Sequence, residues 1–322
     1  MVFYHTANLE VYERCALEKW REGIWAVARF VSPVECFFVI SSFFLFKKIV
    51  LVENKKRGKI VVAYITRLII LYLIWSVLYI PNIIKNFYGR SLIHNVMSFI
   101  YQYAITGYSL QTWYMPSLLF GIIIVSYLFG YSQKEKLLFG AFVLSALILL
   151  CGKSYYYIVP QNRIIDWLIN IGLISLVRSI PFVLIGVYFA CKKELIGRRM
   201  DFVCWIFWGV CSIIEIQILK LNKWAISYDF YVCICPTVYF LMKNIIVKVR
   251  FDFCADIAKI LGKMSTIIYF SHIAIRDLIL AVYKGSEMNG FILWGMTFAL
   301  SVLLAAVIVK LGKKWRVLKY LY

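Results

Sequence analysis

The stretch VECFFVISSFFLF, residues 34–46, decides the fold because it is apolar almost throughout and long enough, with its flanks, to cross a lipid bilayer. A transmembrane helix needs about 20 consecutive apolar residues. The stretch nevertheless carries one carboxylate, Glu35. A charge at the centre of a spanning helix costs about 2.5–3.5 kcal/mol on insertion scales, so such residues are rare and suggest a function by default. The residue that neutralises Glu35 is therefore the first question.

The whole chain has the composition of a membrane protein. Its 322 residues are 63% hydrophobic, with a mean hydropathy of +0.80, whereas soluble domains are about 45–50% apolar. The excess falls in long blocks, which predict an all-α bundle of transmembrane helices that forms one domain over residues 1–322. We predict nine spans, at 25–46, 61–83, 112–130, 136–152, 174–191, 202–219, 229–247, 264–283 and 289–309.

One further segment, LIHNVMSFIYQYAITG at 92–107, has apolar residues on one face only. An amphipathic helix of this kind lies in the membrane interface rather than across the bilayer. We therefore predict an interfacial or re-entrant piece instead of a tenth span.

The net charge of +20 raises the question of a nucleic-acid partner. The basic residues do not form one patch, however, because 21 of the 36 lysines and arginines lie in the C-terminal tail and in loops after odd-numbered spans, against seven in the other loops. The richer side of a membrane protein is cytoplasmic. We therefore expect the C-terminus inside, residues 1–24 outside and no nucleic-acid partner.

The nine cysteines show no metal-ligand spacing, and most lie inside predicted spans. Free cysteine in such places acts as a small apolar residue. We expect no metal site.

Glu35 needs a partner from another helix. Arg29 lies six residues away, which turns it about 240° around the same helix. Counted from the basic loops at 1.5 Å per residue, Glu35 lies about 17 Å above Lys47 and Arg67 lies about 12 Å above Lys59. These depths predict a contact between Glu35 and Arg67. Such a pair could fix the helix register or could serve a catalytic or ligand-binding role. Lysine and arginine at span ends can instead extend to the interface, which is the simpler interpretation of Arg29, Lys243 and Arg276.

Three other side chains allow both a structural and a functional interpretation. His272, in YFSHIAI, fits a hydrogen-bonded helix contact as well as a base. Trp113 and Tyr114, in QTWYMPSLLFG, fit the aromatic belt at a membrane interface, and aromatic rings of this type also stack on sugars.

Six segments in this order resemble the membrane-bound acyltransferase family three, bacterial polytopic enzymes that O-acylate surface sugars and related acceptors. Each segment alone is weakly specific, but together they cover nearly the whole chain. The segments are VFYHTA (2–7), VECFFVISSFF (34–44), AYITRLIILYLIW (63–75), TWYMPSLLFG (112–121), VRSIPFVLIGVYFA (177–190) and MSTIIYFSHIAI (264–275).

Two departures from the family pattern matter. Ser42 stands where the family has the glycine of Phe-Phe-x-x-Ser-Gly, and glycine allows helix backbones to approach closely. The chain also begins at MVFYHTA, which resembles the last turn of the family's first span, so the arginine upstream of the histidine has no counterpart. We expect that most of the first span is missing, through a mis-set start codon or a natural truncation.

The resemblance implies acyl transfer, in particular of acetyl, from cytoplasmic acyl-CoA to a hydroxyl of a cell-surface polysaccharide or glycan precursor, in the bacterial cytoplasmic membrane. CoA is then a substrate, no cofactor is bound, and the oligomeric state is left open. In this scheme His5 is the general base, and Glu35 orients it or an arginine, or holds the acceptor sugar. Arginines would bind CoA phosphates or the oxyanion. The candidates for that role are Arg67, Arg178 and Arg29, and those for acceptor contacts are Trp113, Tyr114 and His272.

Two alternatives remain. A transporter or flippase of an envelope precursor would explain the charges inside the membrane, although the chain has no visible repeat of broken helices. A non-catalytic remnant that lacks the first span is the other alternative.

Overall fold

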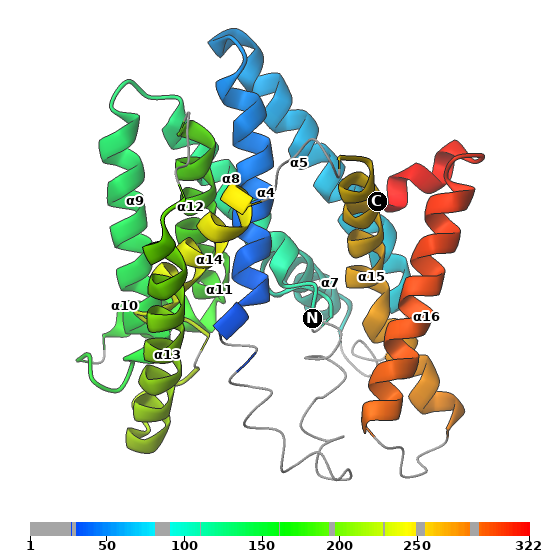
Figure 1. Cartoon of the computed structure of the whole chain (residues 1–322). Coiled ribbons are helices and arrows are strands. Elements are labelled where there is room, and N and C mark those ends of the chain that lie inside the picture. The colour runs from blue at the N-terminus through cyan, green and yellow to red at the C-terminus, as the bar shows by residue number, and fades with distance from the viewer. Residues whose placement is uncertain are drawn as a thin grey trace.

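The computed structural model is a bundle of helices (Figure 1). Every regular element in the described part of the chain is helical, which confirms the predicted fold class. Six of the described helices are long and apolar enough to cross a membrane, and α8 and α14 are shorter apolar helices. The structure describes residues 27, 30–80, 91–109, 111–160, 162–192, 197–227, 229–248, 255–283 and 290–322.

Each of the nine predicted spans overlaps one of nine helices. These helices are α4 (Pro33–Val50), α5 (Asn54–Ser76), α8 (Tyr114–Phe129), α9 (Lys134–Leu149), α12 (Ser179–Cys191), α13 (Arg199–Asn222), α14 (Ile234–Lys248), α15 (Ala255–Val282) and α16 (Gly290–Leu311). The helices α5 and α15 begin seven and nine residues before the predicted spans. The extra turns of both helices contain lysine, which favours helix but ends an apolar window.

The start of α4 differs from the prediction in a way that concerns Glu35. The helix begins at Pro33, after Ser32 interrupts the helical backbone with a φ of 43°. Glu35 therefore lies in the first helical turn rather than near the middle of a span. A carboxylate is stabilised there by the unpaired N–H groups and the dipole of the helix.

The helices α4 and α12 pack against each other, and α12 also packs against α8 and α9 (Figure 1). Gly186 allows this contact, because a Cβ atom at Gly186 would lie 1.9 Å from the Ser42 Oγ and 2.5 Å from the Val39 carbonyl oxygen. Gly186 on α12 thus allows the close approach of the two helices that the family's glycine would permit at the position of Ser42 on α4.

The helices α15 and α16 pack against each other along their length at one side of the bundle (Figure 1). Their link to the rest includes the rings of Trp75 and Phe270, which stack with centroids 5.6 Å apart. The Tyr79 hydroxyl donates to the Phe270 carbonyl at 2.6 Å, and the Trp75 indole donates to the Leu321 carbonyl at 3.1 Å. The C-terminal residues therefore help to hold α5 to this hairpin.

Short helices fill the connections. The predicted interfacial segment forms α7 (Leu92–Tyr101) and the π-helical turn η2 (Gln102–Thr106), and no residue of α7 is buried. Ten residues are too few to cross a bilayer, which agrees with the prediction. The helix α10 (Arg163–Asn170) was not predicted, and α11 (Leu173–Val177) leads directly into α12 through Arg178.

Candidate active site

Glu35 forms a buried ion pair with Arg178. The two residues are 3% and 8% exposed, and they lie at the N-terminal ends of α4 and α12. A buried charge without a partner is strongly unfavourable, so this contact explains how an apolar helix tolerates the carboxylate. The pair joins the acidic position of VECFFVISSFF to the basic position of VRSIPFVLIGVYFA.

The prediction that Arg67 neutralises Glu35 is therefore wrong. Arg67 lies on α5 with an exposed side chain. Distances from the basic loops estimate how deep a residue lies, but they do not say which neighbouring helix it faces. In the folded chain α4 packs its Glu35 end against α12 rather than against the part of α5 that carries Arg67.

The ion pair extends into a network of four charges. The second terminal nitrogen of Arg178 lies 3.6 Å from the Asp229 Oδ2, in the loop before α14. The Lys153 Nζ lies 3.3 Å from the same oxygen and comes from η3 (Leu150–Ser154), which continues α9. Glu35, Arg178, Asp229 and Lys153 are called the four-charge network below. Their signs alternate along the chain of contacts, so each charge lies beside an opposite one.

Sequence reasoning did not select Lys153 and Asp229 as site residues. Both were assigned to the end of a predicted span or to an external loop, where solvated charges are common. The signal that could have found them is positional, because Lys153, Arg178 and Asp229 all lie at or near the predicted external ends of spans.

Trp113 covers the guanidinium of Arg178. The Arg178 Cζ lies 4.7 Å from the centroid of the Trp113 ring, a distance at which an aromatic face attracts a cation. The predicted acceptor residue Trp113 therefore contacts the four-charge network directly.

Tyr114 faces the protein interior. Its side chain is buried, its ring stacks on Phe38 with centroids 4.6 Å apart, and its hydroxyl lies 3.1 Å from the Ser41 Oγ. The aromatic-belt interpretation does not fit this residue, because a belt residue faces the membrane interface. Tyr114 instead packs α8 against α4.

His272 is fully buried on α15, apart from the four-charge network. Its Nδ1 lies 2.9 Å from the Ile268 carbonyl oxygen, and its ring centroid lies 6.4 Å from that of Tyr269. This geometry fits the hydrogen-bonded helix contact. The Tyr269 hydroxyl donates to the Gln111 carbonyl, and the Gln111 amide donates to the Tyr79 hydroxyl at 2.5 Å.

The stretch 111–114 therefore links three parts of the molecule. Gln111 contacts α15 and the end of α5, Trp113 contacts Arg178, and Tyr114 contacts α4. These contacts connect the helix hairpin of α15 and α16 to the four-charge network through a few residues.

Glu215 on α13 holds the segment that carries Asp229. Its carboxylate accepts hydrogen bonds from the backbone N–H groups of Val232 and Cys233 at 2.7 and 2.9 Å and from the Tyr155 hydroxyl at 2.7 Å. Burial and the hydrogen bond to Glu215 raise the pKa of Tyr155. This hydroxyl therefore stays protonated and donates a hydrogen bond to the carboxylate. The backbone that leads from Asp229 into α14 is thereby fixed.

A cavity of about 840 Å³ lies between the end of α4, the start of α5, the end of α8 and the start of α9. These are the helix ends away from the four-charge network. Arg57 and Lys134 bring positive charge to it, and the Lys134 Nζ lies 4.7 Å from the centroid of the Phe129 ring. The Ser126 Oγ, which lines the cavity, is buried and has no hydrogen-bond partner among the described residues. This cavity is called the basic cavity below, and its other lining residues include Phe46, Asn54, Tyr127 and Tyr131.

His5 and Arg29 lie outside the described residues, so their roles stay predictions. Within the described residues, no group of three or more histidine, cysteine, aspartate or glutamate side chains is placed to hold a metal ion.

The comparisons with known proteins identify the family. The family model described as an acyltransferase domain, of acyltransferase family 3, matches residues 1–310, which is nearly the whole chain. No curated protein and no solved structure matches it. The helices long enough to span a membrane and the paired acidic and basic motif positions agree with this match. The chain belongs to acyltransferase family 3 and is a multi-pass membrane acyltransferase.

Proposed function

We propose that the protein transfers an acetyl group from cytoplasmic acetyl-CoA to a hydroxyl of a cell-surface polysaccharide or glycan precursor, in the cytoplasmic membrane of a bacterium. The observation that carries the proposal is the buried pair of Glu35 and Arg178 under Trp113. An arginine held in this way is a pre-oriented donor for an oxygen that becomes negatively charged.

The basic cavity supports a donor site on the cytoplasmic side. It lies at the helix ends that the positive-inside rule assigns to the cytoplasm, where CoA is present. Arg57 and Lys134 would bind the CoA phosphates, and Phe129 or Tyr127 would stack on the adenine ring. Arg67 lies ten residues after Arg57 on α5 and remains a candidate for contacts with the rest of the donor.

The two sites lie along one helix. Eleven residues of α4 separate Glu35 from Phe46 in the wall of the basic cavity, which is about 17 Å at 1.5 Å per residue. The thioester carried on the flexible arm of CoA would have to approach the four-charge network over this distance. The acceptor would enter from the opposite side, where Trp113 offers a ring face to a sugar.

The chemistry follows from these positions. The acceptor oxygen attacks the thioester carbonyl while a base takes the hydroxyl proton, and His5 is the proposed base. The carbonyl oxygen gains negative charge, which Arg178 stabilises. The carbon–sulfur bond then breaks, and the CoA thiolate takes up the proton from the base. The ester of the acceptor and free CoA are the products.

The proposal is tested in membrane vesicles of a host that lacks endogenous glycan acetylation. Vesicles with the full chain, with Arg178→Gln and with Lys55→Gln are given radiolabelled acetyl-CoA and isolated envelope glycan. We expect transfer by the full chain, transfer by Lys55→Gln at the same rate, and a loss of about 100-fold or more for Arg178→Gln. No transfer above empty vesicles, or equal transfer by Arg178→Gln, would contradict the proposal.

A further inference from the structure

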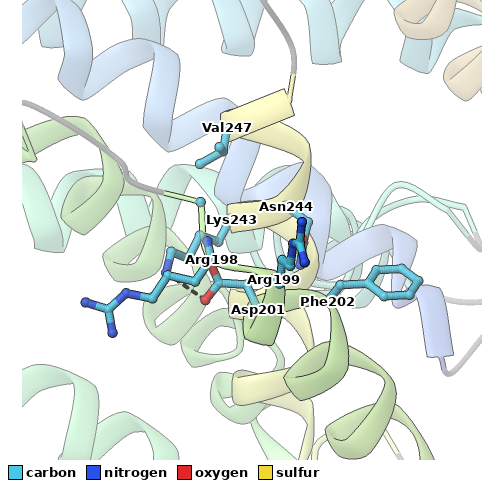
Figure 2. A pocket seen from close by; sticks show the side chains of 8 residues that line it. Arg198, Arg199, Asp201, Phe202, Lys243, Asn244 and Val247 are labelled. Carbon is cyan, nitrogen blue, oxygen red and sulfur yellow. Dashed lines mark hydrogen bonds and ion pairs between the residues drawn. The ribbon is translucent and has the colours of Figure 1, made fainter.

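A second cavity, of about 450 Å³, lies between the start of α13 and the end of α14, away from the four-charge network and the basic cavity. Figure 2 shows Asp201 and Lys243 in contact near its centre, with Arg198 on one side and Phe202 on the other. The residues that line this second cavity are Gly197, Arg198, Arg199, Asp201, Phe202, Lys243, Asn244 and Val247.

The second cavity has an excess of positive charge. Its one carboxylate, Asp201, accepts from the Lys243 Nζ at 2.8 Å and from the backbone N–H of Arg198 at 2.7 Å. Lys243 therefore neutralises Asp201 instead of extending to the interface as its position predicted. The guanidinium groups of Arg198 and Arg199 are exposed and form no ion pair with another described residue. The lining of the second cavity thus carries three basic side chains and one carboxylate, which favours an anionic ligand.

An apolar stripe continues from the second cavity along α13. Phe202, Ile206 and Val210 follow at intervals of four residues, so they lie on one face of the helix. These three side chains are 45%, 40% and 45% exposed, and only 17% of the residues in the apolar part of α13 are buried. A ligand that fits both features has an anionic head and apolar tails.

We propose that the second cavity binds the headgroup of an anionic phospholipid, whose acyl chains lie along Phe202, Ile206 and Val210. Basic pockets between transmembrane helices on the cytoplasmic side bind such headgroups. Both helix ends lead into loops that the charge distribution assigns to the cytoplasm. The neutral pair of Asp201 and Lys243 forms the floor, and Arg198 and Arg199 bind the phosphate. This site goes beyond the proposed acyl transfer and does not depend on it.

The test measures lipid retention by the purified full chain. The protein in detergent is mixed with equal amounts of phosphatidylglycerol and phosphatidylcholine that have the same acyl chains, and bound lipid is counted by native mass spectrometry. The variant Arg198→Gln with Arg199→Gln removes two charges from the second cavity. The control Lys55→Gln with Lys59→Gln removes two exposed charges from α5, outside the lining of either cavity.

We expect the preference for phosphatidylglycerol to fall about fivefold per arginine removed. The control should keep the preference, and thermal unfolding of both variants should match that of the unchanged chain. Equal preference in the arginine variant, or an equal loss in the lysine control, would overturn the proposal.

Soluble glycerol 3-phosphate provides a third arm of the experiment. Because it has the headgroup phosphate without acyl chains, it should displace phosphatidylglycerol only weakly. Displacement at comparable concentrations would mean that the second cavity takes a free anion, and the lipid assignment would be wrong.

Discussion

Glu35 and Arg178 are 143 residues apart in the sequence and form one buried ion pair. A double-mutant cycle with Glu35→Gln, Arg178→Gln and the double variant should therefore give a coupling free energy of about 0.5–3 kcal/mol. The free energy of unfolding is measured by urea titration in detergent, with the helical circular dichroism signal as the readout. Additive effects of the two substitutions would mean that the contact contributes nothing.

Arg67 provides the matched control for this cycle. Because its side chain is exposed on α5, Arg67→Gln should change the free energy of unfolding by no more than about 0.5 kcal/mol. Coupling of Arg67→Gln to Glu35→Gln would favour the original pairing instead.

Gly186→Ala should destabilise the contact of α4 with α12 by about 1–3 kcal/mol. The new methyl group would meet the Ser42 hydroxyl and the backbone of Val39, and the backbone cannot move without shifting α4. The control is Gly140→Ala on α9, where a Cβ has no neighbour within 4 Å. That substitution should stabilise the protein by about 0.5–1 kcal/mol, because glycine is unfavourable inside a helix. The melting temperatures of the two variants should move in opposite directions.

Glu215→Gln should lower both stability and acyl transfer. The carboxylate accepts three hydrogen bonds that fix the segment after Asp229, and hydrogen bonds to a charged group contribute about 1.5–3 kcal/mol each. Tyr155→Phe removes only one of the three and should have a smaller effect on unfolding. An unchanged kcat for Glu215→Gln would show that the position of Asp229 does not matter for transfer.

Arg57→Gln with Lys134→Gln should raise the KM for acetyl-CoA by about tenfold and leave kcat nearly unchanged. Removal of binding contacts that are the same in the ground state and the transition state has this kinetic signature. Steady-state rates at varied acetyl-CoA in vesicles measure it. A fall in kcat at constant KM would place these residues in the chemical step instead of donor binding.

The predictable part of this structure is the part encoded by runs of apolar residues. The nine helices follow from such runs, and two of the errors in their bounds occur where lysine-containing turns extend a helix, at the start of α5 and of α15. The short helix α7 followed from its one-sided apolar pattern, and its place at the membrane interface stays a prediction.

The partner of Glu35 could not be predicted because it depends on which helices are neighbours. Arg67 and Arg178 are both arginines at a plausible depth, and only the packing of α4 against α12 selects Arg178. Lys153 and Asp229 were not predicted as site residues for a related reason. A charge at the end of a span looks solvated until folding brings four such ends together.

The four-charge network has a further consequence for an energised membrane. Two acids and two bases sum to no net charge, so a voltage across the bilayer exerts no net force on the network as a unit. Moving one elementary charge across 100 mV involves about 2.3 kcal/mol, and a neutral set of side chains avoids this work. The voltage acts only on the separation of charges within the network, which the direct contact of Glu35 with Arg178 keeps short.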